Sequence, residues 1–170
     1  MSFRKIYLKE AVEVCNSIVS KCIEKGWSPI ACVVIDANSN VITSMKMDNC
    51  PPIAFPKFAL AKAVTSVTLG ISSRKFRDKY NSSQEKISQM LGMISIMEGQ
   101  IANFPGSVLI SSPIDGSILG SVGVSGASSD QDEYLALQAV KSIFHDCNFE
   151  PSTSTLENSW DHMLGYEIHF

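Results

Sequence analysis

Hydrophobic and polar positions follow helical and strand-like patterns in turn along this chain of 170 residues. Between residues 8 and 25 apolar side chains recur at helical spacing, which predicts a helix that ends at Gly26. An apolar run over 30–35 and a second over 41–47 flank a polar turn at 38–40. Two apolar runs around a short polar turn predict a β-hairpin.

The middle of the chain predicts helices. After the paired prolines at 51 and 52, which end a strand, helical spacing begins near Pro56 and continues to Gly70. Residues 73–82 are polar and predict a helical turn followed by a loop. Residues 84–97 show helical spacing again, with methionines that indicate core filling rather than a cofactor site.

The second half predicts another hairpin and another helix. A turn at 103–106 leads into a strand over 108–111, and Asp115-Gly116 can supply the positive φ angles of a tight turn into a strand that ends at Gly126. A long helix is predicted over 130–147, with acidic residues near its positive N-terminal end.

Glycines inside the strand over 115–126 leave two interpretations open. Gly120 and Gly123 pack no side chain, so they mark either room for a helix above the strand or the close approach of a ligand. Ser125 and Gly126 lead toward the next helix, whose N-terminus can hold an anion. The spacing by itself favours a plain hairpin strand.

The last part of the chain differs in character. Residues 150–159 are rich in Ser and Thr and indicate a linker, whereas Tyr166, Ile168 and Phe170 alternate with polar residues. This alternation predicts a short fifth strand or an arm that docks on a neighbouring molecule. We therefore divide the chain into a domain over 1–149 and a C-terminal tail or arm over 150–170. The order helix, hairpin, helices, hairpin, helix predicts an α+β fold with an antiparallel sheet.

Composition narrows the class of protein. With 45% hydrophobic and 18% charged residues, the chain can build one globular core. The net charge is -3, and the basic cluster at 74–79 is interrupted by Asp78, which indicates a solvated helix face and no nucleic-acid partner. Five cysteines without a CxxC motif indicate reduced thiols. Without a signal-peptide pattern or a membrane-spanning run, we expect a soluble, cytoplasmic protein with no membrane partner.

Few residues suggest chemistry on their own. The three histidines, at 145, 162 and 169, show no metal-binding spacing, and the common nucleotide-binding signatures are absent. Lys62 lies among small apolar residues, where a lysine either has a lowered pKa and serves as base or anion ligand, or extends to solvent at the edge of the sheet.

The loop after the second predicted strand adds two candidates. Asp48 can bind a polar ligand or cap the loop through its own backbone. Cys50 precedes a proline and is either a thiolate ligand of haem iron or a buried structural cysteine.

Four segments resemble the GlcG/HbpS family, which is also found as the C-terminal domain of PduO-type proteins. They are 46–54, the Lys62-Ala63 pair, Phe104-Pro105-Gly106 with Val108, and 115–136 with its glycines, Ser125, Gln131 and Asp132. The resemblance implies a profilin-like fold, a five-stranded antiparallel sheet flanked by helices, assembly into homo-oligomers and, in some members, haem binding.

The sequence departs from the family pattern at several positions. Lys46 replaces an arginine, Asn49 a glycine, Ser107 the second glycine of a turn and Leu109 a proline. Lysine does not match arginine in bidentate anion binding. No histidine precedes position 145, so a haem-ligating histidine from the first helices has no counterpart in this chain.

Together these features predict a pocket where the 47–52 loop, Lys62 and the 123–126 loop meet. The predicted ligand-binding residues are Met47, Asp48, Cys50, Lys62, Gly123, Ser125 and Gly126. The leading hypothesis is a small-ligand-binding protein, with haem or another tetrapyrrole as the candidate ligand. One alternative is an enzyme that acts on a small organic acid or carbonyl compound with Lys62 or Asp48 as base. A second alternative is a non-catalytic oligomeric scaffold.

Overall fold

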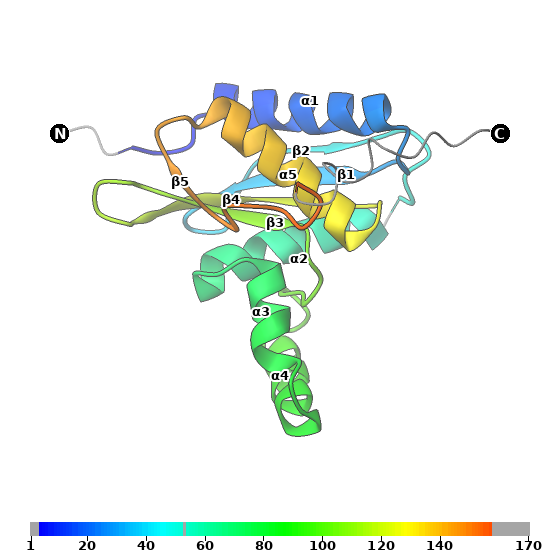
Figure 1. Cartoon of the computed structure of the whole chain (residues 1–170), viewed down its shortest axis with the longest axis vertical. Coiled ribbons are helices and arrows are strands. Elements are labelled where there is room, and N and C mark those ends of the chain that lie inside the picture. Colours follow the sequence, from blue (N-terminus) through cyan, green and yellow to red (C-terminus); the bar gives the residue numbers. More distant parts are fainter. Residues whose placement is uncertain (1–3, 53, 158–170) are drawn as a thin grey trace.

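The computed structural model describes residues 4–52 and 54–157. Five helices and five strands occur in this part of the chain (Figure 1). In chain order they are α1 (Leu8–Lys25), β1 (Ala31–Asp36), β2 (Val41–Lys46), α2 (Ala54–Leu69), α3 (Ser73–Tyr80), α4 (Gln84–Ile96), β3 (Ser107–Ser111), β4 (Ile118–Ser125), α5 (Ser129–Ile143) and β5 (Asn148–Glu150).

The strands form one antiparallel sheet in the order β2-β1-β4-β3-β5. Helices α1 and α5 cover one face, and α2 covers the other face, from which α3 and α4 lead away (Figure 1). The predicted α+β fold with five antiparallel strands flanked by helices is therefore confirmed.

The hydrophobic core is divided by the sheet. Along β1, side chains alternate between the faces: Val34 joins the larger core under α1 and α5, whereas Val33 and Ile35 pack against Ala59 and Ala63 of α2. A third cluster around Phe76 joins α3 to α4. The alternation lets one short strand contribute to cores on both faces.

Gly123 lets α2 lie directly on the sheet. A Cβ atom at Gly123 would lie 2.1 Å from the carbonyl oxygen of Ala59, a distance that no side chain tolerates. A Cβ atom at Gly126, whose φ is +144°, would lie 2.4 Å from the carbonyl oxygen of Pro29. For Gly123 this confirms the first of the two interpretations, room for a helix above the strand. The assignment of Gly123 and Gly126 as ligand-binding residues stays a prediction.

The C-terminal part of the fold differs from the expectation. Helix α5 ends at Ile143 rather than at 147, because Phe144 is fully buried and the chain then turns so that β5 pairs with β3. With three residues, β5 is too short to show an alternating pattern. The strand predicted at 166–170 lies outside the described residues. The domain boundary at 149/150 stays a prediction.

The segment over 73–82 is more ordered than predicted. Helix α3 runs for eight residues, begins with the side chain of Ser72 accepting from the Lys75 amide, and buries Phe76. The description of 74–79 as a solvated helix face is wrong for this aromatic ring and for Arg74, since both turn toward the protein.

Candidate functional site

Lys62 and Asp132 form a buried ion pair around the end of β4. Lys62 lies on α2 and Asp132 in the first turn of α5, on opposite faces of the sheet. The short connection from β4 into α5 brings Asp132 around the end of the strand, where its Oδ2 lies 2.9 Å from Lys62 Nζ. Each side chain is 3% exposed. Lys62 therefore does not extend to solvent at the sheet edge.

Backbone groups complete the pair. Lys62 Nζ also donates to the carbonyl oxygen of Val124 at 2.9 Å, and Asp132 Oδ1 accepts from the Ala127 amide at 3.0 Å. Burial penalises both charges: it lowers the pKa of Lys62 and, against the opposing effect of the ammonium, raises the pKa of Asp132 to about 6. The net charge of the pair therefore changes when Asp132 takes up a proton, at about pH 6.

Gly106 is required for this arrangement. Its φ is +138°, and a Cβ atom there would lie 2.8 Å from Lys62 Nζ and 2.7 Å from the Val124 carbonyl oxygen. Only glycine combines this backbone conformation with so close an approach. The Phe-Pro-Gly turn therefore sets the position of the lysine ammonium.

A cavity of about 230 Å³ opens beside the pair, and we call it the Lys62 pocket. Three phenylalanines form its apolar walls, with Phe58 at 6.3 Å from Phe55 and 6.4 Å from Phe104 between ring centroids. The volume lies below the roughly 300–1,000 Å³ of drug-sized ligand sites. The lining residues are Phe55, Phe58, Lys62, Phe104, Ser125, Ala127, Ser129 and Asp132.

Two of the seven predicted site residues, Lys62 and Ser125, line this pocket. Gly123 and Gly126 lie against backbone, as described above. Met47 packs against the larger core, and its sulfur accepts from the Ile30 amide at 3.4 Å.

The other two predicted residues also lie outside the lining. The side chain of Asp48 is exposed. Cys50 is buried, and burial raises the pKa of its thiol, which disfavours the thiolate that iron ligation needs. The ligand-binding role of these residues stays a prediction.

Sequence reasoning missed Asp132 and the three phenylalanines. Asp132 was assigned only to the positive end of a helix, although it belongs to the segment that carries the family resemblance. Phe104 lies in the Phe-Pro-Gly segment of the same resemblance. Phe55 and Phe58 had no signal of this kind, because an aromatic side chain at helical spacing normally indicates core.

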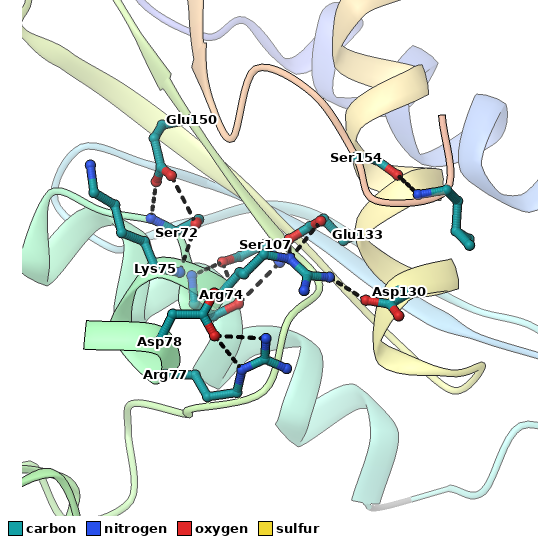
Figure 2. Close-up of polar contacts among 12 residues, drawn as sticks. Ser72, Arg74, Lys75, Arg77, Asp78, Ser107, Asp130, Glu133, Glu150 and Ser154 are labelled. Carbon is teal, nitrogen blue, oxygen red and sulfur yellow. Dashed lines mark hydrogen bonds and ion pairs between the residues drawn. The ribbon is translucent and has the colours of Figure 1, made fainter. Parts of the chain in front are cut away.

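A second buried ion pair lies one residue further along α5 (Figure 2). Arg74 Nε of α3 donates to both carboxylate oxygens of Glu133, at 2.8 and 2.9 Å, and its Nη2 donates to Asp130. Glu133 is 0% exposed and Arg74 is 16% exposed. This cluster binds α3 to α5 and does not line the Lys62 pocket.

Two negative findings concern the described residues. Within 4–52 and 54–157, no group of three His, Cys, Asp or Glu side chains is placed to hold a metal ion. In the same part of the chain, no helix has both the length and the apolar character that crossing a membrane requires.

A protein-family model described as "Haem degrading protein HbpS-like" matches residues 6–141 of the chain. The chain belongs to this HbpS-like family. No curated protein matches the sequence at a significant level.

Solved structures of the same fold include three close in shape. A PduOC–haem complex has a TM-score of 0.71 at 20% identity, over 82% of this chain and 96% of that chain. Klebsiella pneumoniae protein ORFY has a TM-score of 0.72 at 21% identity, over 85% and 94%. A double mutant of Streptomyces reticuli HbpS has a TM-score of 0.69 at 19% identity, over 84% and 90%. At these identities the likeness shows the fold.

Proposed function

We propose that this protein binds a small planar molecule with a carboxylate or similar anionic oxygen in the Lys62 pocket. The observation that carries the proposal is a buried ammonium at the side of an aromatic-walled cavity. A buried charge is costly unless it is paired, and an anionic ligand would add a second partner to the one that Asp132 supplies.

The ammonium has a donor to offer. Lysine carries three N–H donors, and within the described residues Val124 and Asp132 accept two of them. A ligand oxygen can accept the third. Because protonation of Asp132 would leave the ammonium unneutralised, we expect an anion to bind more tightly below about pH 6, where the pKa of Asp132 lies.

The phenylalanines define the other half of the ligand. Phe58 and Phe104 are 42% and 51% exposed, although large aromatic side chains gain most from burial. A flat apolar group that slides between these rings would cover them while its anionic oxygen reaches Lys62.

Haem is the candidate that the family and the PduOC–haem complex suggest. The pocket residues do not fit ligation of its iron, since the lining contains no thiol, thioether or imidazole. His145, the one histidine in the described residues, is exposed beyond the C-terminal end of α5. A propionate of a tetrapyrrole can reach Lys62, and we restrict the haem proposal to that contact.

Calorimetric titration with benzoate, haemin and iron-free protoporphyrin tests the proposal. We expect all three to bind, with protoporphyrin as tight as haemin, because the carboxylate and not the iron makes the contact. Lys62→Met should weaken benzoate at least tenfold, as loss of a charge-assisted hydrogen bond worth about 1.5–3 kcal/mol requires. Lys57→Met, an exposed lysine on the same helix, is the matched control.

A second variant, Phe104→Ala, tests the proposal even if Lys62→Met does not fold. Phe104→Ala removes a half-exposed ring and should fold, yet weaken benzoate severalfold. Absence of benzoate binding to the wild-type protein, or equal affinity in Phe104→Ala, contradicts the proposal. A haemin-specific Soret shift that Cys50→Ala removes would move the site to Cys50.

Enzymatic use of the same pocket is the second candidate. Its support is the lowered pKa of Lys62 beside a carboxyl whose pKa is about 6, a combination that suits proton transfer. Asp48 lies outside the lining and is the weaker candidate base. Deuterium incorporation into the methyl group of pyruvate, lost in Lys62→Met and kept in Asp48→Asn, is the expected result. Equal incorporation with and without protein excludes this reaction.

The proposal also covers the oligomeric state and the cellular compartment of the protein. We assign the protein to the cytoplasm, which the five free cysteines of the described chain support, and we assign it a homo-oligomeric state, which the family resemblance implies. Light scattering of the purified chain measures that state directly.

A further inference from the structure

A groove separate from the Lys62 pocket lies on the α2 side of the sheet, between β2 and α2. Its volume is about 650 Å³. Val33 of β1 belongs to the floor, Pro56 and Leu60 of α2 form one wall, and Lys46 and Lys57 line its margins. We call it the β2 groove.

The groove continues along the molecule. A neighbouring cavity of about 370 Å³ shares Val41, Lys57 and Leu60 with it and extends to 97–100, just beyond α4. Leu60 is only partly buried and Val41 is 51% exposed. Such a long, mostly apolar channel is typical of an interaction surface.

Strand β2 borders this channel and has a free edge. It is the first strand of the sheet, and within the described residues its only partner strand is β1. The alternate amide and carbonyl groups that point away from β1 can pair with a further strand. An extended segment added there would place every second side chain into the groove.

The last 13 residues of the sequence have the composition of such a segment. Six of them are large and apolar: Trp160, Met163, Leu164, Tyr166, Ile168 and Phe170. The last three alternate with Glu167 and His169, which is the period of a strand. This segment lies beyond the part that the family model matches, which ends at residue 141.

We propose that residues 158–170 of one copy of this chain bind along β2 of a second copy, with Tyr166, Ile168 and Phe170 in the β2 groove. Covering these side chains removes apolar surface from water, at about 25 cal/mol per Å². In this register Glu167 and His169 lie on the opposite side of the added strand, away from the groove.

The position of Glu157 favours binding of residues 158–170 to the β2 groove of a second copy over binding to the groove of the same molecule. Glu157 accepts hydrogen bonds from Gln138 and Lys141 of α5. Helices α5 and α2 lie on opposite faces of the sheet (Figure 1), and the β2 groove lies on the α2 side. A segment that starts at Glu157 would spend much of its length, at most about 3.3–3.6 Å per residue, in passing around its own molecule.

Amide exchange of β2 together with light scattering tests the proposal. In the full chain we expect the outward amides of Val41–Lys46 to be protected and the mass to exceed that of one chain. Ile168→Asp places a charge in the groove, so it should speed exchange of these amides at least tenfold and lower the mass. His169→Asp adds the same carboxylate on the other side of the strand and should change neither.

A groove-side pair of variants sharpens the test. Lys57→Glu should weaken the assembly, whereas Lys75→Glu, an exposed lysine on α3, should not. Exchange of β4 amides verifies the fold of each variant, and benzoate affinity at the Lys62 pocket should stay unchanged. Equal β2 exchange in Ile168→Asp and wild type overturns the proposal. Protected β2 amides in a chain that scatters as a monomer overturn docking between copies.

Discussion

Two buried ion pairs involve the consecutive α5 residues Asp132 and Glu133, and their surroundings suit them to different roles. Asp132 binds Lys62 of α2, and Glu133 binds Arg74 of α3. Successive residues of a helix point about 100° apart, so neighbouring carboxylates reach two different helices. The two pairs share their chemistry and differ in what surrounds them.

The described hydrogen bonds of the Arg74 side chain all go to carboxylates of the protein. Its guanidinium binds Glu133 by two hydrogen bonds and Asp130 by another (Figure 2). Arg74 does not line the Lys62 pocket. Lys62 makes one contact with Asp132 and one with a carbonyl, beside an aromatic-walled space. A buried pair becomes a candidate binding site when a donor and a cavity remain beside it.

The largest effect on stability is expected at the Arg74 pair. Arg74→Met leaves the Glu133 carboxylate buried without its cation, so the free energy of unfolding should fall by about 3–5 kcal/mol. Arg77→Met is the control, because its partner Asp78 is half exposed and surface pairs contribute about 0–1 kcal/mol. Urea unfolding measures both. Equal losses would show that Arg74 is no more than a surface cation.

A smaller and recoverable loss is expected at the Lys62 pair. Lys62→Met should destabilise by up to about 3 kcal/mol, partly relieved because Asp132 can take up a proton. The double variant Lys62→Met/Asp132→Leu should regain most of this loss, since apolar side chains often replace a buried pair without cost. Both variants should bind benzoate at least tenfold more weakly than the wild-type protein. Recovered binding in the double variant contradicts the role given to Lys62.

The smallest expected effect is the pH dependence of stability that Asp132 causes. Burial raises the pKa of Asp132 to about 6 from 3.8, so the folded chain holds this proton more tightly than the unfolded chain. Its contribution to stability is therefore complete below about pH 4 and is lost as the pH rises to about 6. Relative to Lys62→Met/Asp132→Leu, wild-type stability should fall by about 1–3 kcal/mol over this range. A parallel pH profile in the two proteins would refute the shift.

Much of the fold could be predicted because its signals are local. The helical spacing before Gly26 gave α1, and two apolar runs around a polar turn gave the hairpin of β1 and β2. The C-terminal end of α5 and the short β5 could not be predicted in this way. The helix ends where Phe144 is buried in the core, and β5 forms by pairing with the edge of β3. Both depend on contacts between residues that are distant in the sequence.

Two of the eight residues that line the Lys62 pocket could be predicted for the same reason. Lys62 stands out as a charge among alanines, and Ser125 closes a strand that glycines mark. By residue type and spacing alone, Asp132 and Phe58 show nothing unusual, since an acid near a helix N-terminus and an aromatic at helical spacing are common. They become candidate site residues only because the fold places them beside Lys62 in the same pocket.

The sequence by itself determined the α+β order of elements, the glycine positions that let α2 and the Phe-Pro-Gly turn approach the strands, and the family. The tertiary structure decided which charges are buried and with which partners. Partners such as Lys62 and Asp132 are 70 positions apart, and their pairing depends on two helices meeting around the end of β4. Periodicity describes neighbours along the chain, whereas burial and pairing are properties of neighbours in space.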